Sequence, residues 1–303
     1  MDFAILLVTV LPVALRVMVP IALAAIGEVF AERAGVVNIG LEGILVISAF
    51  FAVVGADAFG SPWAGLVAGV LAGLGVGLLH ALLSIYLKGD QIISGVGINL
   101  LGLGLVGFGA VVLWGSRSFQ VPNALWVPGI PVPWGSVSPL VIVTVLAAPF
   151  TWWLLHKTAF GLRVKAVGEN PEAADVVGVP VERVRLLAVL YGAALAGLGG
   201  AALSLDWTHT ILNTLPAGRG FIALAAVVFS KLNPLLALFG GFLFGYFDAL
   251  AIQLASAGGA GEEGQIPYQF VRMIPYLATL IVVAGAIGRA RFPQAIAQPY
   301  RRE

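Results

Sequence analysis

The stretch AGLVAGVLAGLGVGLLHALLSIYL, residues 64–87, decides the fold class, because it contains no charged residue over its whole length. A bilayer core about 30 Å thick is crossed by roughly 20 apolar helical residues. The rest of the chain is similar: of 303 residues, 60% are hydrophobic and 10% are charged, and the mean hydropathy is +1.01. Soluble domains carry about 25% charged residues. The composition therefore argues against a soluble enzyme and predicts an all-α, polytopic transmembrane helical bundle.

Eight segments are long and apolar enough to span a membrane, namely 3–25, 38–56, 64–87, 91–115, 139–155, 186–206, 234–256 and 268–288. A shorter run, 220–231, predicts a short, broken or re-entrant helix, which is tolerated where protein or water surrounds it. The bundle then has about nine spans, within a range of eight to ten, in a single transmembrane domain over residues 1–303. The start of the chain lacks the features of a removable signal peptide, so 3–25 is read as a retained span.

The cations indicate the orientation, because loops rich in Lys and Arg face the cytoplasm. With the loop 156–185 on that side, nine alternating crossings place twelve of the sixteen cations there. The twelve are Arg33, Lys88, Lys157, Arg163, Lys165, Arg183, Arg185, Lys231, Arg289, Arg291, Arg301 and Arg302. The loops 116–138 and 257–267 and the N-terminus fall outside, and the C-terminus lies inside. Arg16 does not fit; if residues 3–15 form a separate helix, the count becomes ten and the N-terminus moves inside.

The reactive side chains predict no catalytic residue, metal site or cofactor. The chain has no cysteine, and His80, His156 and His209 share no ligand spacing. The stretch GLGLVG (102–107) has the letters of a dinucleotide fingerprint, but it lies within a predicted span and not between a strand and a helix. No Gly-Lys pair occurs, so a phosphate-binding loop for ATP is absent from the sequence. The net charge of +1 gives no basic field for nucleic acid.

Small residues recur at helical spacing in three spans, at Gly65, Gly69, Gly73 and Gly77, at Ala193, Gly197 and Ala201, and at Gly241 and Gly245. Such stripes let membrane helices approach closely. We expect tight packing there, and helices that slide during gating are the alternative.

Polar residues concentrate in two glycine-rich interruptions, at 27–43 and at 213–220. Comparable interruptions in two halves of a chain are typical of a transporter's central site and of an inverted repeat. Because ionisable groups in membranes usually face a cavity or the bundle interior, the pathway candidates are Asn38, Glu42, Asn99, Arg219, Phe221, Asp248 and Gln253. A purely structural role is the alternative for each. Phe221, Trp207 and Tyr246 could stack on a base or anchor the chain at the interface.

The long loop 156–185 predicts a docking element. Asn170, Pro171 and Glu172 form a helix-start signal, with Asn as N-cap and Pro in the first turn, and Gly178 ends the helix. Connections this long are commonly functional. A plain solvated connection is the alternative.

At these residues the chain resembles a known family. The runs GEVFAERAGVVNIGLEG (27–43), FGLRVKAVGENPEAADVVGV (160–179) and GRGFIALAAVVF (218–229) are similar to permeases of bacterial ABC importers for nucleosides and simple sugars, relatives of ribose and branched-chain amino acid permeases. The resemblance covers most of the chain, from about Leu15 to Arg289. Residues 230–233, SKLN, depart from the glycine and aromatic residue expected after VVF.

The resemblance implies a permease in the bacterial inner membrane, with its C-terminus in the cytoplasm. It implies an ABC ATPase that carries ATP and Mg, an extracytoplasmic solute-binding protein, and a second related permease chain in a heterodimer or a homodimer. No cofactor binds this chain. The ATPase would contact a coupling helix that corresponds to Glu169–Gly178, and the implied coupling residues are Arg163, Glu169, Asn170, Pro171, Ala173, Ala174 and Gly178.

Two other classes remain to be compared with an ATP-driven importer. An ion-coupled secondary transporter needs a membrane-embedded carboxylate that titrates or binds sodium, for which Glu42 and Asp248 are candidates. An intramembrane enzyme needs a nucleophile with a base or a metal cluster, and the sequence contains neither pattern.

Overall fold

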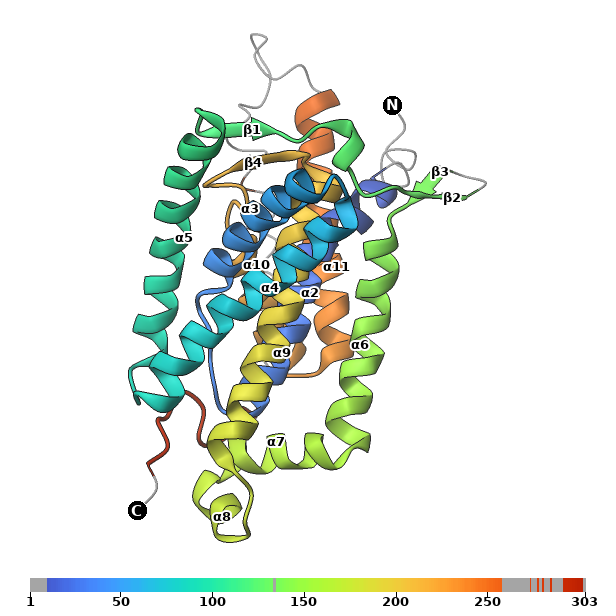
Figure 1. Cartoon of the computed structure of the whole chain (residues 1–303). Helices are drawn as coiled ribbons and strands as arrows, with labels where there is room; N and C mark the ends of the chain where they lie inside the picture. The colour runs from blue at the N-terminus through green and yellow to red at the C-terminus, as the bar shows by residue number, and fades with distance from the viewer. Residues whose placement is uncertain are drawn as a thin grey trace.

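The computed structural model describes residues 10–132, 135–257 and 291–301, together with the single positions 273, 277, 280 and 284. Long helices run side by side along one axis, and shorter elements close the two ends of the bundle (Figure 1). Seven helices in the described part of the chain are long and apolar enough to span a membrane. The predicted loop 257–267 and span 268–288 lie outside the described residues.

The first half contains α2 (Leu11–Arg33), α3 (Leu41–Phe59), α4 (Pro62–Ala81) with its π-helical end η1 (Leu82–Tyr86), and α5 (Gln91–Trp114). A connecting segment follows with β1 (Ser118–Gln120), η2 (Asn123–Leu125), β2 (Ile130–Val132) and β3 (Gly135–Val137). Then come α6 (Pro139–Lys157), α7 (Ala159–Glu169) and α8 (Pro171–Val176). The second half contains α9 (Val181–Ala202), the π-helix η3 (Leu203–Trp207), β4 (Thr210–Leu212), α10 (Arg219–Ser230) and α11 (Pro234–Ala257).

The predicted spans agree with these helices within a few residues except at the N-terminus. There the prediction of 3–25 is wrong, because α2 continues to Arg33. Glu28 and Glu32 end the apolar pattern, yet both are buried in the bundle and the helix passes through them. A separate helix over 3–15 is also wrong at its end, since residues 11–15 belong to α2.

The prediction of an all-α chain needs a small correction. β1 pairs antiparallel with β4, and β2 pairs antiparallel with β3, each in a two-stranded sheet. The first pair joins segments from opposite halves of the chain, at the end of the bundle that we call the strand end (Figure 1).

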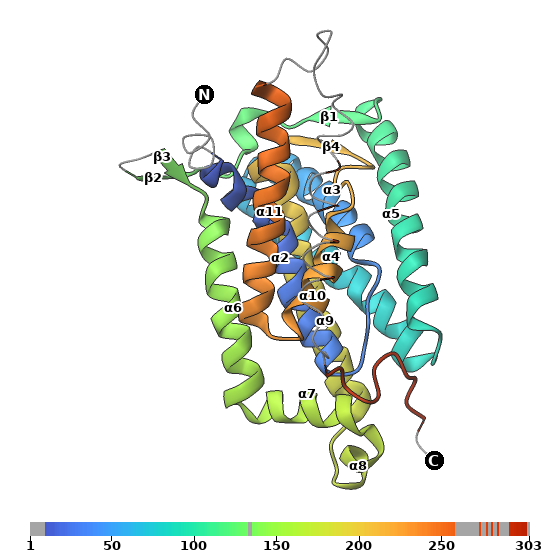
Figure 2. The same ribbon diagram turned by 180° about the vertical axis from the view of Figure 1, so that it is seen from behind.

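The small-residue stripes pack as predicted. A methyl group on Gly73 would lie 2.6 Å from the Ala193 carbonyl oxygen, and one on Gly77 would lie 2.3 Å from the Ala193 side chain, so α4 lies against α9. Gly241 contacts Ala22 in the same way and joins α11 to α2. Figure 2 shows α11 running beside α2 at the front of that view. The central helix is α2, in which 83% of the residues in its most apolar stretch are buried. In α5, at the edge of the bundle, the same share is 22%.

The helices alternate in direction between the strand end and the opposite end, which we call the α7–α8 end (Figures 1 and 2). Segment 291–301 lies at the α7–α8 end, where Ala295 donates to the Gly168 carbonyl and Ala297 to the Gly35 carbonyl. The described members of the predicted cytoplasmic set gather at this end: Arg33, Lys88, Lys157, Arg163, Lys165, Arg183, Arg185, Lys231, Arg291 and Arg301.

Candidate translocation site

The two glycine-rich interruptions meet inside the bundle. α3 and α10 both begin part-way along it, after the irregular segments 34–40 and 213–218, and they run in opposite directions (Figure 2). Their N-terminal ends touch, because a methyl group on Gly220 would lie 2.4 Å from the Glu42 backbone nitrogen. We call this contact between the two helix starts the junction. Opposite directions are what an inverted repeat requires of the two helices, and interrupted helices that meet at the repeat interface are typical of such transporters. The repeat as a whole stays a prediction, because span 268–288 is not described.

Glu42 joins the two helices at the junction. It lies in the first turn of α3, and its carboxylate accepts hydrogen bonds from the N–H groups of Gly218, at 2.6 Å, and Gly220, at 2.7 Å. The first N–H groups of a helix have no partner within the helix, and the helix dipole favours an anion beside them. Glu42 therefore caps α10 from the other half of the chain. Glycine at 218 is required because φ is +87° there.

Arg219 follows the cap and is held on three sides. Its guanidinium donates to Asp248 of α11, at 2.5 Å, and to the Pro216 carbonyl, at 3.0 Å. It also lies over the ring of Trp207, 4.4 Å from the ring centroid. The side chains of Arg219 and Asp248 are only 10% and 15% exposed. A buried pair of this kind fixes geometry more than it adds stability, so it positions the start of α10 against α11 and η3.

The first interruption is held by amide groups and a second carboxylate. Asn99 of α5 accepts from the Gly43 N–H, at 2.8 Å, and donates to the Ile39 carbonyl, at 3.1 Å. The Asn38 N–H donates to Glu28 of α2, at 2.6 Å, while the Asn38 side chain accepts from Gly40. These bonds satisfy the backbone where the helix is broken, which hydrocarbon cannot do.

Five of the seven predicted pathway residues thus lie at the junction or brace it: Asn38, Glu42, Asn99, Arg219 and Asp248. The other two are farther along their helices or exposed. Phe221 is 51% exposed on α10, and Gln253 is half-buried on α11, more than a turn beyond Asp248. Whether any of the seven lines a path stays a prediction.

Several polar residues that support the junction were not predicted. Glu28 lies within the motif 27–43 and accepts from the Asn38 N–H, and Gln91 of α5 accepts from the Val37 N–H, at 2.8 Å. His80 contacts the Ser94 hydroxyl, at 2.9 Å, and the Val37 carbonyl, at 3.2 Å. Polar residues in apolar spans are the signal that could have identified them. No cluster of three metal-ligating side chains occurs among the described residues.

The predicted docking element forms a short helix at the α7–α8 end. The Asn170 side chain accepts from the Ala173 N–H, at 2.9 Å, Pro171 stands in the first turn, and Gly178 follows with φ +84°. The predicted start and stop of this helix are therefore confirmed. Of the predicted coupling residues, Arg163, Glu169, Asn170, Ala173 and Gly178 are exposed, Pro171 is half-buried and Ala174 is buried. The helix α7 before it was not predicted.

Residues 230–233, which differ from the pattern expected of the family, form a tight turn between α10 and α11. Lys231 and Leu232 both have a left-handed backbone, with φ of 52° and 59°. Arg33 donates to the Leu232 carbonyl, at 3.0 Å and 3.1 Å from its two nitrogens. The end of α2 therefore holds this turn without a glycine.

Comparison with known proteins assigns the chain to a family. The family described as branched-chain amino acid transport system, permease component, matches residues 11–284. The guanosine ABC transporter permease protein NupQ of Bacillus subtilis is 37% identical over 99% of this chain and 98% of its own length. The nucleoside ABC transporter permease protein NupC of Lactococcus lactis is 36% identical over 91% of each chain. The putative glucose ABC transporter permease protein TsgC13 of Haloferax volcanii is 34% identical over 93% of this chain and 94% of its own length.

These matches include all three motifs that carried the resemblance and every described helix from α2 to α11. The chain belongs to the branched-chain amino acid transport system permease family of ABC transporters.

Proposed function

We propose that this chain is the membrane permease subunit of an ATP-driven ABC importer, which moves a nucleoside or a simple sugar into the cytoplasm by alternating access. The observation that carries the proposal is the junction, where Glu42 of the first half caps α10 of the second half. Helix starts and irregular backbone that meet inside a bundle supply polar backbone groups to a solute in the middle of the membrane. The relatives for guanosine, nucleosides and glucose support this range of substrates.

The α7–α8 end is the cytoplasmic side in this proposal, and the C-terminus lies there. The concentration of Lys and Arg at that end supports the orientation. The cell membrane of a bacterium is the expected location, with the strand end facing outward toward a solute-binding protein.

The motor belongs to a partner, an ABC ATPase that holds ATP and Mg. It docks on α8, where Val176 and Val177 are 87% and 77% exposed beside the exposed residues Glu169 and Ala173. Exposed apolar side chains at the end of a bundle suit a protein contact. A second, related permease chain completes the assembly, as a heterodimer by preference and a homodimer as the alternative.

The test uses the assembled importer in proteoliposomes. Ala173→Glu or Glu169→Lys should abolish uptake and the co-purification of the ATPase, while the thermal unfolding temperature of the permease stays unchanged. Arg117→Glu, at the strand end, is the matched control. Normal uptake and normal co-purification in the α8 variants would contradict the coupling assignment.

The same vesicles separate this function from an ion-coupled transporter. Both candidate carboxylates have partners, since Glu42 caps α10 and Asp248 pairs with Arg219. Uptake should follow internal ATP and persist with an uncoupler. Uptake that collapses with the uncoupler while ATP is maintained would favour the secondary transporter.

A further inference from the structure

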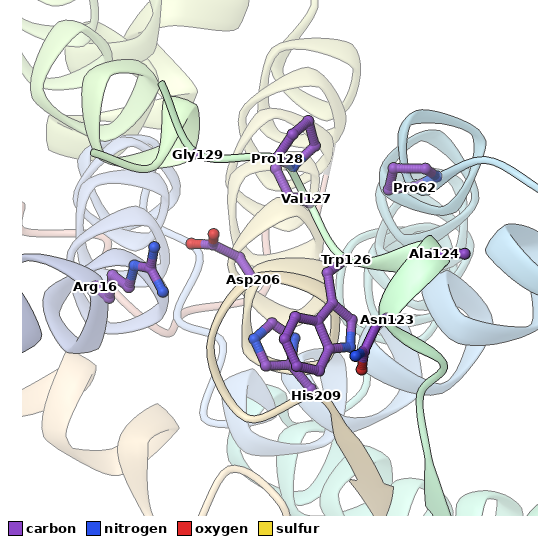
Figure 3. Close-up of a pocket in the computed structure, with 10 residues that line it drawn as sticks. All are labelled: Arg16, Pro62, Asn123, Ala124, Trp126, Val127, Pro128, Gly129, Asp206 and His209. Carbon is purple, nitrogen blue, oxygen red and sulfur yellow. The ribbon is translucent and has the colours of Figure 1, made fainter. Parts of the chain in front are cut away.

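A second polar site lies at the strand end, away from the junction. It is a pocket of about 610 Å³ between the starts of α2 and α4, the segment 123–129 and the end of α9 (Figure 3). Pockets that hold small molecules usually have volumes of roughly 300–1,000 Å³. Its polar and aromatic lining residues are Arg16, Asn123, Trp126, Asp206 and His209. Arg16 is the cation that the predicted orientation could not place.

The π-helix η3 contributes a polar residue to this pocket and connects the pocket to the junction. A π-helical turn ends α9, and such turns often occur at functional sites. Within it, Trp207 covers Arg219 at the junction, and its neighbour Asp206 lines the outer pocket. The Val127 N–H donates to the Leu205 carbonyl, at 3.0 Å, and so fastens the segment 123–129 to the same turn. The pocket and the junction therefore share one structural element.

Two buried polar atoms in the pocket lack hydrogen-bond partners. Asp206 is 2% exposed, and its Oδ1 atom has no partner among the described residues. The Nδ1 atom of His209 is also buried without a partner there. A buried polar atom without a partner is costly, so both atoms suit a ligand that brings hydrogen-bonding groups into the pocket.

The aromatic groups add a flat surface. Trp126 stacks on His209 with ring centroids 3.7 Å apart and 13° between the planes. The Trp126 Nε1–H already donates to the Val121 carbonyl, at 3.0 Å, so the indole offers its face and no hydrogen bond. Burial, and then the nearby Arg16, lower the pKa of His209. In Figure 3 the Asp206 carboxylate and the Arg16 guanidinium face each other beside this stack.

We propose that the outer pocket binds the transported solute on its way to the junction, by the planar, N–H-bearing ring of a purine-like nucleoside. Asp206 Oδ1 accepts from an N–H group on one edge of the ring. Arg16 donates to a ring carbonyl or nitrogen, and the Trp126–His209 stack covers the ring face. A simple sugar offers no aromatic plane for that stack. This inference rests on the proposed function, since it names the substrate class and adds a site.

The test is photolabelling of the reconstituted importer, without ATP, by a radioactive azido-purine nucleoside. Label should appear in peptides that contain residues 123–129 or 206–209, and excess guanosine but not glucose should prevent it. Asp206→Asn should lower this label about tenfold, the effect of losing one hydrogen bond to a charged group. Trp126→Leu should also lower it severalfold. Asp57→Asn, an exposed carboxylate on α3, and Trp153→Leu, an exposed ring on α6, are the matched controls and should not change it.

Three results would overturn the inference: label that maps elsewhere, protection by glucose instead of guanosine, or label that Asp206→Asn leaves unchanged. If Asp206→Asn releases the binding protein but leaves the label intact, the pocket is a protein-docking site and the inference is wrong. Unchanged thermal unfolding of the Asp206→Asn and Trp126→Leu complexes confirms that they are folded. The proposed function fails on a different result, namely wild-type complex that takes up neither nucleosides nor sugars with ATP.

Discussion

The two interrupted segments, 34–40 and 213–218, each lead into a helix that starts inside the bundle, but different side chains hold them in place. Segment 34–40 is held by Asn99, Gln91 and Glu28, which bond its backbone from neighbouring helices of the same half. Its first residues, Ala34 and Gly35, also accept from Arg185 of α9 and from the Ala297 N–H. Segment 213–218 leads into α10, which depends on the charged side chains of Glu42, Arg219 and Asp248. One of these charges comes from the opposite half of the chain. The comparison teaches that several separate groups hold the first segment, whereas the start of α10 depends on the single carboxylate of Glu42 for its cap.

The largest effect is expected where the second segment depends on the first. Glu42→Ala removes the acceptor for the N–H groups of Gly218, which is half-buried, and Gly220, which is buried, and leaves both without that partner. We expect a loss of about 3 kcal/mol in the free energy of unfolding, from two hydrogen bonds to a charged group, and loss of most uptake. Denaturation in detergent and uptake in vesicles measure the two effects. Asp57→Ala removes an exposed carboxylate of the same helix and should change neither.

A smaller effect is expected at the ion pair. Arg219→Gln or Asp248→Asn leaves one charge without its partner, and because both side chains keep some exposure we expect a loss of about 2 kcal/mol. The double variant should lose less than the sum of the two single variants. A double-mutant cycle on unfolding free energy measures this coupling. Strict additivity would show that the pair does not hold α10 in place.

The smallest effect is expected in the first segment. Asn99→Ala removes two neutral hydrogen bonds, and the bonds from Gln91 and Glu28 remain. We expect a loss of about 1 kcal/mol in unfolding free energy and uptake close to wild type. If Asn99→Ala damages uptake as much as Glu42→Ala, the two segments are equivalent and the distinction between them is wrong.

Composition and local spacing predicted much of this structure, because membrane spans depend on runs of apolar residues and helix starts depend on nearby caps. The bounds of α5 and the cap at Asn170 are examples. The end of α2 was placed wrongly, since hydropathy cannot show that Glu28 has a buried partner in the Asn38 N–H. The link between Glu42 and Gly218 crosses 176 positions, and no local rule contains such a contact.

The outer pocket illustrates the same limit. Arg16 was recognised as a misfit and the 116–138 loop as external, but Asp206 was not singled out and His209 was noted only as a histidine without ligand spacing. They become a site only because η3 and the segment 123–129 are fastened together. By contrast, the small-residue stripes were interpretable because each packs along one helix face.

The most direct test of the account is the ratio of uptake to ATP hydrolysis in proteoliposomes that contain the importer with Glu42→Gln. This variant keeps the shape of the side chain but removes the charge that caps α10. The account predicts that uptake falls at least severalfold while ATP hydrolysis stays near the wild-type rate, because the junction is part of the conduit and the motor is another protein. Uptake and hydrolysis that both remain at the wild-type level would contradict it.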